Sequence, residues 1–176
     1  LFETSVHDDP SVLEEIRDGC RLALVAQMNR LVLRHTDHFF GNRRDLHVWL
    51  TWHDYRNANL MILLAYILLG HPDWKDGEIT LYAAYPKPEV RERTAELQAM
   101  ISEGRLLISE KNVRVFGTDD RTDFSRLMEV KSAHADLVIR GFTETKLEQK
   151  GPELFERHQG LRDILWVSAE ERIFIE

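Results

Sequence analysis

The most prominent hydrophobic pattern in the chain is a run of uncharged, almost wholly apolar residues at positions 60–69. Its length decides what it can be, because a helix needs about 20 apolar residues to cross the hydrocarbon core of a membrane. Asn57 and Asn59 precede the run, and Gly70 and Pro72 end it. The pattern therefore predicts a buried helix of a globular α/β domain and not a transmembrane segment.

Around this run, strand-like and helix-like patterns alternate along the chain. Runs of β-branched and aromatic residues favour strands, whereas apolar residues three and four positions apart favour helices. The predicted strands are residues 45–52, 77–85, 112–117, 136–142 and 163–169, and the predicted helices are residues 57–69, 89–104, 123–135 and 152–161. Such alternation indicates parallel pairing with right-handed crossovers. We therefore expect an α/β fold with a doubly wound, mostly parallel five-stranded sheet and helices on both faces.

The two ends of the chain add elements to this alternation. Residues 11–26 predict an N-terminal helix, and residues 29–35 form a short strand-like run after it. At the other end, residues 172–176 predict a short strand that closes a C-terminal hairpin. We expect a leading segment at residues 1–44 and an α/β domain at residues 45–176.

Composition and charge narrow the class of protein. Of the 176 residues, 43% are hydrophobic and 30% are charged, which is typical of a globular domain with a substantial core. The net charge of -7 argues against a general nucleic-acid-binding protein, which usually has a basic surface. With Cys20 as the only cysteine, an internal disulfide is excluded and a reducing compartment is expected. The N-terminus has neither a signal-peptide pattern nor an initiator methionine, so we expect a fragment of a longer protein.

Ligands of doubly wound sheets bind beyond the carboxyl ends of the strands, which directs attention to the segment at residues 141–151. We expect this segment to be a solvated loop. It has glycines only at its ends, and the two glutamates between them would repel a phosphate group. Lys146 and Lys150 leave a weak anion site as an alternative.

Two groups of polar residues are candidates for other chemistry. His53 and Asp54 resemble a general base with an orienting carboxylate, although Asp54 is more simply a cap for the next helix. His35, Asp37 and His38 are able to ligate a metal, but they lack a clear fourth ligand and lie in a predicted loop. No nucleophile accompanies either group in a recognisable motif. We therefore expect no enzymatic activity, no cofactor and no resident metal.

Several segments resemble a known protein family when they are taken together and in order. They are HVWLTW at residues 47–52, the leucine-rich run at residues 60–69, WKD at residues 74–76, ADLV at residues 135–138 and LRDILWVSAEERIFIE at residues 161–176. This order and spacing are similar to those of the cytoplasmic C-terminal domain of the cation-chloride cotransporters. The resemblance covers about residues 29–176.

The resemblance implies a function without catalysis. In that family the domain follows a twelve-helix membrane region, consists of two halves similar to universal stress proteins, and dimerises. It implies that this chain is the second half of such a domain and lies at the cytoplasmic face of the cell membrane. The expected partners are a second copy, the first half of the domain and the membrane region of a transporter that moves chloride with sodium or potassium.

The chain also departs from the family pattern. Residues 57–59 are Asn-Ala-Asn where the family often has Asp-Gly-Gly, so any role of that turn does not carry over. The glycine-rich loop with which many stress proteins bind ATP is absent after Phe142. An alternative function nevertheless stays open, namely a stress-protein-like module that binds a nucleotide or another small ligand.

A dimer interface requires exposed apolar surface, and two regions are candidates for it. One is the exposed side of the C-terminal strands, with Trp166, Ile173 and Phe174. The other is the leading helix, with Leu22 and Val25. These five residues are the predicted interface positions.

Overall fold

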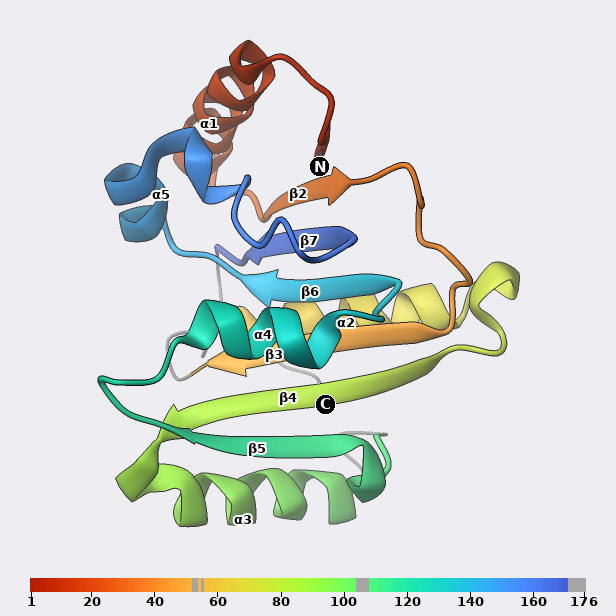
Figure 1. The fold of residues 1–176 in the computed structure, drawn as a ribbon. Helices are drawn as coiled ribbons and strands as arrows, with labels where there is room; N and C mark the ends of the chain where they lie inside the picture. The colour runs from red at the N-terminus through yellow and green to blue at the C-terminus, as the bar shows by residue number, and fades with distance from the viewer. Residues whose placement is uncertain (52–53, 55, 104–107, 171–176) are drawn as a thin grey trace.

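The computed structural model describes residues 1–51, 54, 56–103 and 108–170. Its strands form one seven-stranded sheet in the order β1-β2-β7-β6-β3-β4-β5 (Figure 1). The strands are β1 (Phe2–Ser5), β2 (Arg30–His35), β3 (Asp45–Thr51), β4 (Glu78–Pro86), β5 (Val113–Thr118), β6 (Leu137–Gly141) and β7 (Asp163–Ser168). The α-helices are α1 (Pro10–Val25), α2 (Ala58–Leu69), α3 (Val90–Ser102), α4 (Phe124–Ser132) and α5 (Glu144–Lys150).

The direction of winding reverses once within the sheet. From β3 the chain adds β4 and then β5 on one side, and it then crosses back to place β6 and β7 on the other side. Every neighbouring pair is parallel except β2 and β7. The switch point therefore lies between β3 and β6, and the predicted doubly wound, mostly parallel α/β fold is confirmed.

The sheet is wider than the five predicted strands, which correspond to β3 through β7. The predicted strand-like run at residues 29–35 is β2, and it pairs antiparallel with β7. Beyond it, β1 forms the edge of the sheet and was not predicted, because four residues give too short a pattern. The leading segment thus contributes two strands to the same sheet. The predicted last strand at residues 172–176 lies outside the described residues.

The segment between β6 and β7 differs from the prediction. The expected loop at residues 141–151 contains α5, where the Thr143 side chain accepts a bond from the Lys146 amide, as an N-terminal cap does. Gly151 ends α5 with a positive φ of 62°. The expected helix at residues 152–161 is wrong, because only the short 3₁₀ turn Gly151–Leu154 forms and irregular backbone follows it.

Two hydrophobic clusters lie on opposite faces of the sheet. On the α2/α3 face, these two helices pack against side chains such as Val48 and Leu81. On the α1/α4/α5 face, the three helices pack against side chains such as Trp49 and Trp166. In Figure 1, α4 lies in front of the sheet and α2 lies behind it. The apolar run at residues 60–69 lies within α2 and contributes Leu60, Met61, Ile62 and Ala65 to the first cluster, as predicted.

The lengths of the helices also bear on whether any of them could cross a membrane. Among the described residues, no helix combines sufficient length with sufficient apolar character to do so.

Candidate functional site

The carboxyl ends of β3, β6 and β7 are joined by two buried polar residues. Asp54 lies at the end of β3 and accepts bonds from Thr51, at 2.9 Å from its amide and 2.6 Å from its hydroxyl. Asn57 donates to the Phe142 carbonyl at 3.1 Å and accepts from the Ala169 amide at 2.9 Å. Asn57 therefore bridges the segments that follow β6 and β7. These bonds give both residues a structural role.

Gly141 allows these residues to pack closely against the end of β6. A Cβ atom at Gly141 would lie 1.8 Å from Asp54 Oδ1 and 2.8 Å from Asn57 Nδ2. Only a residue without a side chain fits there. The candidate pair of His53 and Asp54 is not tested as a base with its orienter, because His53 lies outside the described residues. Asp54 Oδ2 accepts both bonds from Thr51.

A cavity of about 310 Å³ opens beside this junction, on the α1/α4/α5 face of the sheet. We call it the switch-point cavity. Its lining comes from the loop before α4, the end of β6, α5 and the segment after it. The lining residues are Thr122, Asp123, Phe124, Ser125, Arg140, Gly141, Phe142, Lys146, Leu154, Arg157 and Trp166. Three of them are cationic.

Arg140 occupies an unusual position for a cation. Strand register places it on β6 directly between Trp49 of β3 and Trp166 of β7, and its side chain is only 9% exposed. Its guanidinium carbon lies 4.4 Å from the centre of the Trp166 ring, at cation–π distance. Its Nη1 donates to His158 Nε2, whereas its Nε has no hydrogen-bond partner in the part of the chain that the structure describes.

Charge states follow from the surroundings of these groups. Burial first, and then the charges of the nearby Arg140 and Arg157, lower the pKa of His158 to about 3. His158 is therefore neutral at physiological pH, and its 3.5 Å approach to Glu129 is not an ion pair. Burial also lowers the pKa of Arg140 to about 10, so Arg140 keeps its charge. The pKa of Lys146 is lowered by burial first, then by Arg140 and Arg157, against the opposing influence of Asp54.

The cations of the switch-point cavity form no close ion pair within the described residues, although the charge of Asp54 acts on both Arg140 and Lys146. In the described part of the chain, no ion pair within 4.0 Å involves Arg140, Lys146 or Arg157. The one carboxylate in the lining, Asp123, caps α4 by accepting from the Arg126 amide at 3.0 Å. This arrangement suits an anionic ligand. The sequence had suggested Lys146 as part of a weak anion site. It did not lead us to Arg140, although a single arginine within an apolar strand is unusual enough to indicate a functional position.

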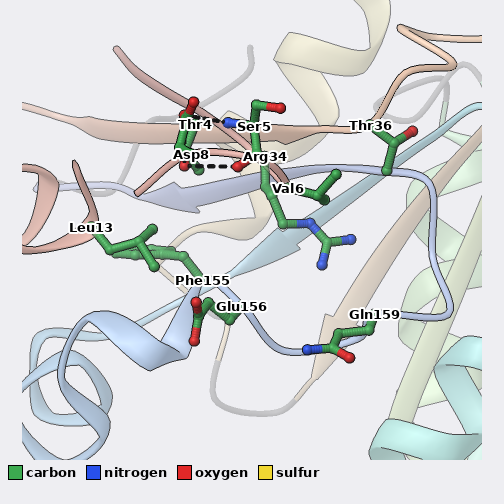
Figure 2. A pocket seen from close by; sticks show the side chains of 10 residues that line it. All are labelled: Thr4, Ser5, Val6, Asp8, Leu13, Arg34, Thr36, Phe155, Glu156 and Gln159. Carbon is green, nitrogen blue, oxygen red and sulfur yellow. Dashed lines mark hydrogen bonds between the residues drawn. The ribbon is translucent and has the colours of Figure 1, made fainter. Parts of the chain in front are cut away.

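A second cavity of about 430 Å³ lies near the β1 edge of the sheet, beyond the ends of β1 and β2 (Figure 2). Figure 2 shows Arg34 extending from the sheet toward the loop that carries Glu156 and Gln159. There its guanidinium donates to the carbonyls of residues 157, 158, 161 and 162 at 2.9 to 3.2 Å. Asp8 is likewise engaged, because it accepts from the Ser5 amide at 2.7 Å. The polar groups here mainly hold the protein together.

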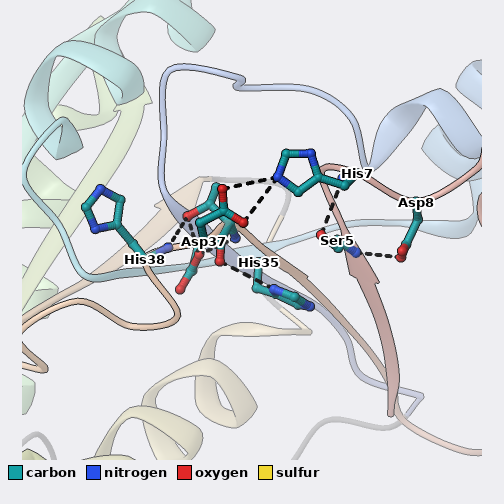
Figure 3. Close-up of polar contacts among 8 residues, drawn as sticks. Ser5, His7, Asp8, His35, Asp37 and His38 are labelled. Carbon is teal, nitrogen blue, oxygen red and sulfur yellow. Dashed lines mark hydrogen bonds and ion pairs between the residues drawn. The ribbon is translucent and has the colours of Figure 1, made fainter.

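The candidate metal ligands near residue 35 are not brought together. Figure 3 shows the rings of His35 and His38 pointing in different directions from Asp37. Asp37 instead lies 3.1 Å from His7, and His35 lies 3.3 Å from Glu3. Among the described residues, no group of three acidic, histidine or cysteine side chains could hold a metal ion.

The predicted interface residues fall into three groups. Trp166 is a correction, because its side chain is fully buried between β2 and β6 and does not reach the surface. Ile173 and Phe174 lie outside the described residues. Leu22 and Val25 on α1 are 73% and 84% exposed, so they remain available for contact with a partner.

The fold is similar to two solved structures. One is the cytoplasmic domain of a prokaryotic cation chloride cotransporter, with a TM-score of 0.66 and 19% identity over 97% of this chain. The other is a functionally unknown protein from Pseudomonas aeruginosa, with a TM-score of 0.55 and 15% identity over 96% of this chain. This chain covers 63% and 62% of those two chains, which is just under two thirds. No protein-family model and no curated protein matches the sequence.

These similarities concern the fold. The strand order β5-β4-β3-β6-β7, with β1 and β2 added beyond β7, is that of the doubly wound sheet expected for a universal-stress-protein-like domain.

Proposed function

We propose that the chain is a regulatory and assembly domain at the cytoplasmic face of a cation-chloride cotransporter. The transporter would move chloride together with sodium or potassium, and the domain would have no catalysis of its own. The observation that carries this proposal is the agreement of fold over 97% of the chain with the cytoplasmic domain of such a transporter. The ordered sequence motifs, from the Trp49 strand to the C-terminal segment, support it independently.

The exposed apolar side chains of α1 are the proposed assembly surface. Leu22 and Val25 are three positions apart, so they lie on one face of the helix. Met28, just beyond the helix, is also 58% exposed. Exposed apolar side chains that cluster in this way mark surfaces of protein contact more often than isolated ones do. We assign this surface to contact between two copies of the domain.

A dimer of this kind would connect two transporter subunits. The rest of each domain would contact the first half of the cytoplasmic region and the membrane region of its own chain. A small rotation of one domain against the other would then change the equilibrium between conformations of the membrane region. Such a rotation regulates transport only if the two conformations place the domains differently.

The assembly surface can be tested by sedimentation. The wild-type chain is expected to form dimers as its concentration rises, and a double variant with Leu22→Lys and Val25→Lys is expected to stay monomeric. Val130→Lys is a matched control, since Val130 is 66% exposed on α4, away from α1. Because all three positions are exposed, each change should alter the free energy of unfolding by no more than about 0.5 kcal/mol. A wild-type monomer at high concentration would contradict the proposed dimer.

The transporter assignment is tested separately on the complete gene product. We expect membrane-spanning helices upstream of the chain and chloride-dependent uptake of rubidium, as a potassium tracer, or of sodium in reconstituted vesicles. The double variant at Leu22 and Val25 should change the uptake rate without abolishing membrane insertion. A complete reading frame without membrane-spanning segments would refute the assignment.

A further inference from the structure

We propose that the switch-point cavity binds a phosphate group, either as inorganic phosphate or as part of a small phosphomonoester. The inference rests on the geometry of Arg140, Lys146, Arg157 and Trp166 and does not depend on the transporter assignment. It concerns a part of the protein remote in sequence from the proposed assembly surface on α1.

The first argument is a pair of unpartnered buried donors. Arg140 Nε and Trp166 Nε1 both lack a hydrogen-bond partner among the described residues, and both residues line the switch-point cavity. Trp166 is fully buried and Arg140 is 9% exposed. Native proteins leave few buried donors without a partner. Two such donors beside one cavity indicate that the cavity accommodates a hydrogen-bond acceptor.

The second argument is the charge around the cavity. Arg140, Lys146 and Arg157 face it, with Asp123 as the only carboxylate in the lining, and that carboxylate is already bonded to the Arg126 amide. Cations gathered without ion pairs in a partly buried site repel one another, and an anion between them removes that repulsion. The acceptor that fits this cavity is therefore negatively charged.

The third argument concerns which anion fits. The donors differ in kind: a planar guanidinium, an ammonium, an indole N–H and the hydroxyl of Ser125, which accepts from Arg157 and keeps its own hydrogen. An oxyanion offers several acceptor oxygens to such a set, and arginine in particular binds phosphate through its fork of N–H groups. The N-terminal end of α4, which is nine residues long, also adjoins the cavity and adds a partial positive charge.

The size of the cavity extends the argument to the second form of the ligand. The cavity, at about 310 Å³, is much larger than the space that one ordered water molecule requires. A free phosphate ion has only five heavy atoms and leaves part of this space unfilled. The apolar side chains of Phe142 and Leu154 line the remainder, which suits a short organic group attached to the phosphate.

A purely structural role for Arg140 explains fewer of these observations than an anion site does. Packing on Trp166 and the bond to His158 explain why Arg140 is ordered. They do not explain why Lys146 and Arg157, from two other segments, face the same cavity. An anion site explains all three.

Calorimetric titration of the purified chain tests the proposal. Sodium phosphate and glycerol 3-phosphate are titrated separately, at one pH and at an ionic strength kept constant with sodium chloride. Saturable binding of at least one of them is expected. Lys146→Gln should weaken that binding about tenfold or more, because it removes a charge-assisted hydrogen bond. Lys150→Gln is the matched control on the same helix, since Lys150 is exposed and does not line the cavity.

The outcomes are distinct. Tighter binding of glycerol 3-phosphate would assign the cavity to a phosphomonoester, and tighter binding of inorganic phosphate would assign it to the free ion. Three results would overturn the proposal: no saturable binding, equal weakening by Lys146→Gln and Lys150→Gln, or the same heat from sodium chloride alone. Arg140→Lys, which keeps the charge but loses the fork, should also weaken binding. Its circular dichroism spectrum shows whether the fold is retained.

Discussion

The two faces of the sheet differ in the kinds of side chain that they bury. On the α2/α3 face, the buried side chains of β3, β4, β6 and β7 are hydrophobic. On the α1/α4/α5 face, the strands and helices also bury Arg34, His47, Ser132, Arg140 and His158. Burying polar groups costs free energy unless they are bonded. The first face therefore supplies stability, whereas the second combines stability with groups that are able to recognise a ligand.

The largest expected effect tests the apolar face. Leu81 of β4 is fully buried there, and Leu81→Ala should lower the free energy of unfolding by about 3 to 4 kcal/mol through lost transfer free energy and the cavity left behind. Urea denaturation measures this change. Phosphate binding should persist in the folded variant, because Leu81 lies on the other face from the switch-point cavity. If the folded variant lost phosphate binding as well as stability, the two faces would not have the separate roles described above.

A pH dependence should come from the polar face. Burial lowers the pKa of His47 to about 4, compared with about 6.5 in the unfolded chain. The unfolded state therefore binds more protons between these values, and stability is lost as the pH falls from 6.5 toward 4. His47 alone accounts for about 3 kcal/mol over that range. Urea denaturation between pH 7 and pH 5 would show the slope.

The slope can be assigned to His47 by substitution. His47→Asn keeps a polar atom near Ser132 but cannot be protonated in this range, so it should reduce the slope. His158 contributes in the same direction, since its pKa is also lowered, to about 3. An unchanged slope in the Asn variant would show that His47 is not responsible.

The smallest effect concerns one hydroxyl group on the polar face. Ser132 Oγ accepts from Trp49 Nε1 at 2.8 Å and lies 2.9 Å from His47 Nδ1. Ser132→Ala leaves the buried Trp49 donor without a partner and should cost about 1 to 3 kcal/mol. Ser102→Ala on the exposed side of α3 is the control and should have little effect. Equal stabilities of the two variants would mean that the Ser132 bonds contribute nothing.

Much of the fold could be predicted because its elements are long and regular. The alternation from β3 to β6 leaves clear patterns, and the buried helix α2 follows from the length of its apolar run. The errors lie where an element is too short to leave a pattern, or where contacts with residues distant in sequence determine the local structure. The four residues of β1 are ordered by pairing with β2, and α5 buries only Leu147 along its seven residues.

The candidate site was less predictable than the fold. Lys146 could be suspected from its loop, but nothing local indicates that Arg157 and Trp166 lie beside it. They meet only because β6 and β7 are neighbours and the intervening segment folds back over the sheet. Conversely, Asp54 was predicted to cap the following helix, but the structure shows it bonded to Thr51, and Asn57 is the N-cap residue of α2.

The clamp formed by Arg34 has a consequence for the order in which the molecule assembles. One guanidinium binds four carbonyls that are 123 to 128 positions away in the chain. The irregular segment that carries Arg157 and His158 therefore cannot reach its final shape until β2 has paired with β7. Contacts between such distant parts of a chain form slowly, since a large loop must close first. We therefore expect the segment that carries Arg157, which is part of the wall of the switch-point cavity, to reach its final shape late in folding.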